Sequence, residues 1–152
     1  MVKTIHFLAG FLATFTIVTF FLSTVVVEVF GSPAAVATVK SLIVAPGLFI
    51  LVPAIIAAGV SGFALSKSRR GRLIETKKKR MPFIAANGLL VLVPAAILLD
   101  RWASAGSFGV TFYLVQGAEL LAGSVNLILM GLNIRDGLKL SGRFRASRTT
   151  AP

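Results

Sequence analysis

The chain has 152 residues, of which 56% are hydrophobic and 14% are charged, and its mean hydropathy is +0.90. Soluble domains carry roughly 25% charged residues, so this composition excludes an ordinary soluble domain and indicates a membrane protein. Lys and Arg number 16 against five Asp and Glu, and there is no cysteine. The lack of cysteine excludes disulfides, thiolate metal sites and cysteine nucleophiles, and one histidine with five carboxylates leaves little material for hydrolytic or metal-dependent active sites.

Four uncharged, apolar runs of the sequence are long enough to cross a bilayer. A hydrocarbon core about 30 Å thick needs roughly 20 residues of helix. The runs cover residues 7–27, 41–65, 82–99 and 108–134. They predict an all-α membrane protein with four transmembrane helices, arranged as an up-down-up-down bundle that occupies residues 1–134.

Positively charged residues gather on one side of the predicted bundle. Lys3, the loop 66–80 and the tail 135–152 together hold 14 of the 16 Lys and Arg residues. Because Lys and Arg next to a membrane helix resist translocation, this asymmetry predicts that both termini and the long loop face the cytoplasm. The tail is expected to be flexible, and the economy of the chain suggests a bacterial inner membrane.

A run of four basic residues stands directly before the third predicted helix: Lys77, Lys78, Lys79 and Arg80. Such juxtamembrane clusters attract anionic lipid headgroups by about 1 kcal/mol per charge. Nucleic-acid binding is the other interpretation, but it needs a folded basic surface or aromatic platforms, and the loop has no aromatic residue. The sequence therefore predicts the bilayer and its anionic headgroups as partners, and no nucleic acid.

The second and third runs share a short repeat. Residues 47–58 read GLFILVPAIIAA and residues 88–99 read GLLVLVPAAILL, which match at seven of twelve positions. The runs cross in opposite directions, so one interpretation is an inverted repeat of the kind found in transporters, and the other is chance similarity between two apolar helices. Pro53 and Pro94 lie near the middle of their runs, where each removes a helix hydrogen bond, which predicts two kinks.

The fourth run carries a row of polar residues at helical spacing, here called the polar row: Gln116, Glu119, Asn126 and Asn133. Steps of three and seven residues place them on one face of a helix. Because such side chains are costly against lipid, this face must point into the bundle, toward another chain or along a wet cavity. Glu119, about 15 Å from the end of its helix, is either neutral and hydrogen-bonded to a neighbouring amide or a carrier of a proton or cation.

Two further charged residues flank the turn between the first and second runs. Glu28 ends the first run and Lys40 precedes the second. We expect them at the membrane surface, where they could pair with each other. Surface ion pairs contribute about 0–1 kcal/mol, so little is expected of this one.

Small residues form a second line on the fourth run, next to the polar row. Gly117, Ser124 and Gly131 are spaced seven apart, and Gly123 lies beside them. Small side chains let helix backbones approach closely in membranes. These four residues are therefore predicted to pack against another helix.

The single histidine, His6, stands at the start of the first run and is followed by Gly10 four residues later. Over about twenty residues, this arrangement resembles the opening helix of small four-span membrane proteins of the copper-resistance D and haem-b cytochrome type. The resemblance implies haem b bound through His6, with a second axial histidine that this chain lacks. Met81, Met130 or the histidine of another copy would then be the second ligand. The other interpretation is a histidine at the membrane interface.

The sequence contains no recognisable pattern of catalytic residues or metal ligands, so a non-enzymatic protein is expected. The first functional hypothesis is a self-associating bundle or a subunit of a larger membrane complex. The second is a transporter or proton-relay protein that uses Glu119 and the polar row. The third is a haem-b electron carrier that uses His6, and outside this hypothesis no cofactor is predicted.

Overall fold

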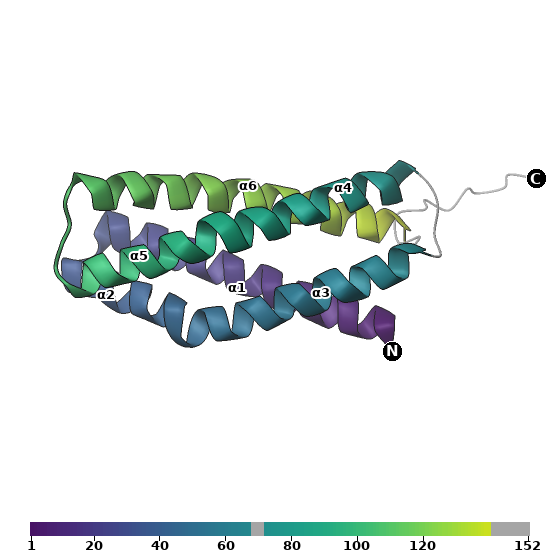
Figure 1. Ribbon diagram of the computed structural model, residues 1–152, viewed down its shortest axis with the longest axis horizontal. Helices are drawn as coiled ribbons and strands as arrows, with labels where there is room; N and C mark the ends of the chain where they lie inside the picture. Colours follow the sequence, from purple (N-terminus) through teal and green to yellow (C-terminus); the bar gives the residue numbers. More distant parts are fainter. Residues whose placement is uncertain (68–71, 141–152) are drawn as a thin grey trace, which may run out of the picture.

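The structure is a computed structural model that describes residues 1–67 and 72–140 (Figure 1). Within these residues the backbone is helical apart from short links, and no strand occurs. The helical segments in chain order are α1 (Val2–Phe30), α2 (Pro33–Leu42), η1 (Ile43–Leu48), α3 (Phe49–Lys67), α4 (Arg72–Asn87), η2 (Gly88–Leu92), α5 (Val93–Ser104) and α6 (Val110–Leu140). Of the two segments labelled η, η2 is a short π-helical turn, and η1 contains a break between two helices at Ala45.

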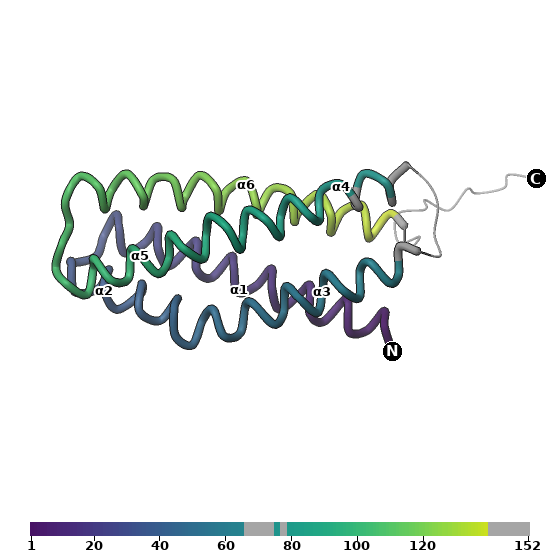
Figure 2. Tube along the Cα trace, in the orientation of Figure 1, coloured from purple at the N-terminus to yellow at the C-terminus, as the bar shows by residue number. Residues whose placement is uncertain are grey.

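Four helical stretches are long and apolar enough to cross a membrane: Val2–Phe30, Pro33–Leu65, Lys79–Ser104 and Val110–Lys139. Consecutive stretches run in opposite directions, as the ribbon in Figure 1 and the Cα trace in Figure 2 show. The predicted all-α, up-down-up-down membrane bundle is therefore confirmed, and the chain is a multi-pass membrane protein. We call the end with links 31–32 and 105–109 the turn end, and the opposite end, where α1 begins and α6 ends, the basic end.

The links at the turn end follow from local sequence. Ser32 caps α2, because its Oγ accepts a hydrogen bond from the Ala35 backbone N–H at 3.3 Å, and Pro33 occupies the first helical turn, where its missing N–H is not needed. In the other link Gly106 has a φ of 67°, a conformation that suits glycine. Both chain reversals are therefore tight, which keeps neighbouring stretches antiparallel.

The surface of the bundle is apolar and its interior contains small and polar side chains. On α1, the rings of Phe7, Phe11 and Phe15 are exposed and stack along the outside. One core cluster contains Ala13 and Leu51 with their neighbours between α1 and α3. The side chains that are fully excluded from solvent include a lysine, an asparagine and an aspartate. This distribution suits a chain surrounded by hydrocarbon, where polar groups must find partners inside.

The helix irregularities differ from the predicted kinks. The second stretch breaks at Ala45, whose φ of −137° and ψ of 118° are extended, while Pro53 lies inside the continuous helix α3. The break falls there because Pro46 disfavours the helical conformation in the residue before it. In the third stretch Pro94 lies in the first turn of α5, directly after the π-helical turn η2.

The basic segment predicted as loop 66–80 is helical from Arg72 onward, and residues 68–71 lie outside the described residues. Its Arg, Leu, Glu and Lys residues favour helix, so α4 starts well before Pro82, which lies inside the helix. The C-terminal boundary also differs, because α6 continues to Leu140 and includes the first residues of the predicted tail 135–152. The remainder of the tail, 141–152, lies outside the described residues.

Candidate functional site

The polar row of α6 lies inside the bundle. Gln116, Asn126 and Asn133 are 3%, 1% and 6% exposed, and the Glu119 side chain is 13% exposed. Asp136, one step further along the same face, is 1% exposed. Lipid-facing positions between them, such as Leu121, are apolar. Polar groups therefore follow the interior of the bundle over most of the length of α6.

Glu119 forms an ion pair with Lys40 of α2. The Lys40 Nζ lies 2.7 Å from the Glu119 Oε2, and the lysine side chain is fully excluded from solvent. The Gln116 Nε2 donates to the same Oε2 at 3.0 Å. Two donors on one oxygen, one of them charged, stabilise the ionised carboxylate. This arrangement differs from the expectation of a Lys40 at the membrane surface.

The depth of the two residues explains why they meet. Lys40 is eight residues into α2 and Glu119 is ten residues into α6, and both helices start at the turn end. At 1.5 Å per residue, their backbones lie roughly 12 and 15 Å from that end. The sequence positions therefore predict that Lys40 and Glu119 lie at similar depths. This agreement appears only when both depths are counted from the turn end.

A second carboxylate belongs to this cluster. Glu28 of α1 lies close enough to Lys40 and Glu119 for their charges to act on it. Its Oε1 is buried and has no hydrogen-bond partner in the described part of the chain, and neither has the Oε1 of Gln116. We call Glu28, Lys40, Gln116 and Glu119 the Lys40 cluster; it combines two carboxylates with one ammonium group.

A pair of amides connects α4 and α6 in the middle of the bundle. The Asn87 Nδ2 donates to the Asn126 Oδ1 at 2.9 Å and to the Ala122 carbonyl at 3.0 Å. In return the Asn126 Nδ2 donates to the Ile84 carbonyl at 3.3 Å. This exchange of hydrogen bonds holds the two helices together directly beside η2.

A second ion pair closes the interior face of α6 at the basic end. The Arg80 Nη1 lies 2.8 Å from the Asp136 Oδ2, and Arg135 contacts the other carboxylate oxygen at 3.4 Å. Arg80, predicted to contact anionic lipid, is thus paired inside the protein. Of the other residues in that prediction, Lys79 is exposed and the side chains of Lys77 and Lys78 lie outside the described residues.

One residue of the polar row makes no side-chain hydrogen bond within the part of the chain that the structure describes. Both polar side-chain atoms of Asn133, Nδ2 and Oδ1, are buried and make no hydrogen bond to the described residues. A buried amide with neither bond satisfied costs free energy unless a water or ligand reaches it. Asn133 lies between the amide pair at Asn126 and the ion pair at Asp136.

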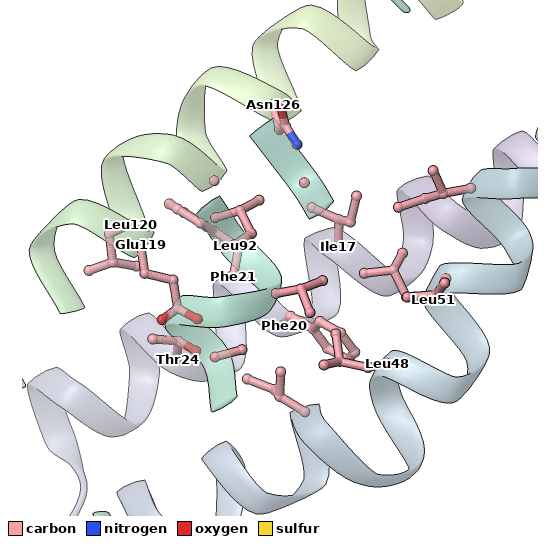
Figure 3. A pocket seen from close by; sticks show the side chains of 17 residues that line it. Ile17, Phe20, Phe21, Thr24, Leu48, Leu51, Leu92, Glu119, Leu120 and Asn126 are labelled. Atoms are coloured by element: carbon pink, nitrogen blue, oxygen red, sulfur yellow. The ribbon is translucent and has the colours of Figure 1, made fainter. Parts of the chain in front are cut away.

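A partly open cavity of about 70 Å³ lies within the bundle beside the Lys40 cluster (Figure 3). Its walls are apolar except for a few groups, among them Thr24, Glu119 and Asn126. A water needs about 10–15 Å³ measured in this way, so the cavity has room for several waters. Both irregular turns contribute to the walls, η1 through Ile43 and Leu48 and η2 through Gly88 and Leu92.

His6 connects α1 to α3 at the basic end. Its Nδ1 lies 3.0 Å from the Ala58 carbonyl oxygen and 3.2 Å from the Ser61 Oγ. A Cβ on Gly62 would lie 2.9 Å from the imidazole Cε1 and 3.4 Å from the Met81 methyl, so the ring needs a glycine there. Met130 packs elsewhere, against the core between α1 and α3. Haem ligation by His6 stays a prediction.

The small residues of α6 differ in what they face. Gly123 is buried against Phe21, whose ring would lie 3.3 Å from an added Cβ. Around Gly117 and Gly131 an added Cβ would meet nothing within 4 Å, and the Ser124 hydroxyl donates to the Leu120 carbonyl of its own helix. Within the described part of one chain, Gly123 packs against Phe21 of α1, whereas the backbone at Gly117 and Gly131 is not covered by another helix.

No family model, curated protein or solved structure matches this chain. In the described ranges, 1–67 and 72–140, no group of three His, Asp or Glu side chains is placed to hold a metal ion.

Proposed function

We propose that this protein is a membrane transport protein that moves a proton or a small cation along the interior face of α6. The observation that carries the proposal is the Lys40–Glu119 ion pair, whose lysine is fully buried, beside a cavity within the bundle. Ionisable groups inside a membrane-spanning bundle are costly and mark ion and proton pathways. The proposal places the basic end in the cytoplasm and the chain in a bacterial inner membrane, in agreement with its distribution of Lys and Arg.

The two irregular turns support a transport site at the cavity. They lie at the start of the repeated segments, since η1 ends with Gly47 and Leu48 and η2 begins with Gly88. In transporters, interrupted helices in corresponding positions of two inverted segments point to the binding site, and π-helical turns are frequent at functional sites. Both turns line the same cavity. This agreement favours the inverted-repeat interpretation over chance similarity.

The distribution of ion pairs supports a path that is closed at both ends. Glu119 pairs with Lys40 toward the turn end, and Asp136 pairs with Arg80 toward the basic end. The two acids are 17 residues apart on one helix, or about 25 Å. The cavity, the Asn87–Asn126 pair and the unpartnered Asn133 lie between them. An ion that crosses would need each pair to open in turn.

The test is proton flux in liposomes that contain the purified protein and a trapped pH-sensitive dye, with a membrane potential imposed by a potassium gradient and an ionophore. Wild-type protein is expected to carry protons, and E119Q is expected to fall to the level of protein-free vesicles. E75Q is the matched control, because Glu75 is an exposed acid on α4. Full flux through E119Q, or no flux of protons or alkali cations through wild type, contradicts the proposal.

A second candidate function is a self-associating bundle or a subunit of a larger membrane complex. It is favoured by the open backbone at Gly117 and Gly131, which lie two seven-residue spacings apart on the same helix. Leucine at both positions would keep a second helix away, so G117L/G131L is expected to lower the oligomer number counted by photobleaching of single labelled proteins in bilayers. An unchanged number, or a monomeric wild type, removes this candidate.

A further inference from the structure

The two carboxylates of the Lys40 cluster are not equivalent. Glu119 receives two hydrogen bonds on one oxygen, from Lys40 and from Gln116. Glu28 has a buried oxygen without any donor in the described part of the chain. An acid that receives donors is stabilised in its ionised form, whereas a buried acid oxygen without a donor is stabilised by taking up a proton.

The charge balance leads to the same assignment. One ammonium group cannot neutralise two carboxylates, and although the Glu28 side chain is only half-buried, a second negative charge close to Glu119 disfavours ionisation of both acids. The charged groups that act on Glu28 are Lys40 on α2 and Glu119 on α6. The third helix packed against α1 is α3, whose one charged residue is Lys67 at its last position. One further positive charge is therefore needed to neutralise the cluster.

The oxygens present suit a proton better than a metal cation. Hard cations such as Mg²⁺ and Ca²⁺ take six or more oxygen ligands. In the Lys40 cluster, the buried side-chain oxygens that lack a hydrogen bond to any described residue are Glu28 Oε1 and Gln116 Oε1. The Lys40 ammonium group also repels a second cation. A proton needs only one oxygen, and the buried Glu28 Oε1 supplies it.

We propose that Glu28, and not Glu119, holds the exchangeable proton, and that Lys40 moves between the two carboxylates as this proton comes and goes. The inference rests on the proposed transport function. In the loaded state, the proton is on Glu28 Oε1, Lys40 remains with Glu119, and the cluster is neutral. When the proton leaves Glu28, Lys40 moves toward the new carboxylate and Glu119 loses its charged partner.

A route between Glu28 and the cavity is present on α1. Thr24 lies one helical turn before Glu28 on the same face, is 3% exposed, and lines the cavity together with Glu119. Figure 3 shows Thr24 and the Glu119 carboxylate at the same end of the cavity. The hydroxyl of Thr24 can accept and donate a hydrogen bond, so it can pass a proton between cavity water and Glu28. Loss of that hydroxyl in T24V is expected to slow the flux that wild type carries.

The test is infrared spectroscopy of the reconstituted protein across a pH titration. Wild type is expected to show the C=O stretching band of one buried carboxylic acid, which disappears as the pH rises. Replacing a glutamic acid by aspartic acid keeps the acid but shifts its band. E28D is expected to shift the band and E119D to leave it in place, with E75D as the exposed control. A band that E119D shifts and E28D does not, or no band at any pH, overturns the proposal.

Thermal unfolding in detergent gives a second readout that needs no transport. E28Q resembles the protonated acid and keeps the Lys40–Glu119 pair, so its unfolding temperature should equal or exceed that of wild type. E119Q removes the ionised partner and should unfold at a lower temperature. Equal destabilisation by both variants overturns the assignment to Glu28. Absent flux of both protons and alkali cations in wild type would refute the transport function, whereas proton flux with the infrared band on Glu119 would refute this inference alone.

Discussion

Lys40 and Glu119 lie 79 positions apart in the chain, and their side chains meet at 2.7 Å inside the bundle. The pair joins α2 to α6 where the cavity begins, with Lys40 completely excluded from solvent. Because the Lys40 ammonium group is excluded from solvent, its charge depends on the Glu119 carboxylate. The consequences for stability and for transport can be measured separately.

The first prediction concerns the stability of this pair. K40M leaves the Glu119 carboxylate without its cation, and E119L leaves Lys40 without its anion. Removing one partner of a buried pair costs about 3–5 kcal/mol, while replacing both by apolar residues is often close to neutral. We therefore expect K40M/E119L to be more stable than either single variant, measured by reversible unfolding in mixed micelles. Additive losses in the double variant would show that the two side chains do not interact.

The second prediction concerns the amide pair between α4 and α6. N126A removes the hydrogen bonds with Asn87 and with the Ile84 carbonyl. Hydrogen bonds between membrane helices contribute about 0.6 kcal/mol on average and up to about 1.7 kcal/mol, and a loss in the upper part of this range is expected because both amides are involved. S124A is the control, since the Ser124 hydroxyl bonds only its own helix among the contacts described here. Equal losses in the two variants would contradict a special role for the pair.

The third prediction uses two glycines of α3 that differ in their surroundings. G62A places a methyl group 2.9 Å from the His6 ring, which must move away from the Ala58 carbonyl; overpacking of this kind costs about 1–3 kcal/mol. G59A meets nothing within 4 Å and should change the free energy of unfolding by less than about 1 kcal/mol, in the stabilising direction. Comparison of the two unfolding free energies checks the position of His6. A neutral G62A would contradict it.

The fourth prediction concerns orientation. Because the chain has no cysteine, a single introduced cysteine is labelled without background. E75C on α4 and S107C in the link before α6 are both exposed, at opposite ends of the bundle. In intact bacterial cells, a thiol reagent that cannot cross the inner membrane is expected to label S107C and to reach E75C only after lysis. The reverse pattern would place the basic end outside the cell.

Hydropathy and periodicity were sufficient to predict the four-helix architecture and the inward orientation of the polar row. Uninterrupted apolar runs require helices in lipid, and a helix with one polar face in a bundle turns that face inward. The break at Ala45 follows from the effect of Pro46 on the residue before it, although the kink of this run was predicted at Pro53. The segment 66–80 was predicted as a loop, and the helix propensity of its residues explains why it is helical from Arg72 onward.

The sequence did not predict in the same way which polar side chains pair with each other. Asn87 lies in an apolar run without any periodic polar neighbour, so its pairing with Asn126 depends on how α4 packs against α6. Arg80 looked like a lipid-binding residue, and the opposite acid, Asp136, fell in what looked like the tail. Lys40 and Glu119 could have been matched by their depth from the turn end. The sequence predicts which faces are buried, but pairing between faces requires the relative heights and rotations of the helices.

The most direct test of the account is water access along α6. Single cysteines at Asn126 and Asn133, which lie on the interior face, are compared with single cysteines at Leu121 and Ile128, which face outward. If the interior face lines an ion path, a water-soluble thiol reagent reacts with the first two in bilayers and not with the second two. Unreactive interior positions would mean a sealed packing core, and reactive outward positions would mean that the face assigned to lipid is wrong.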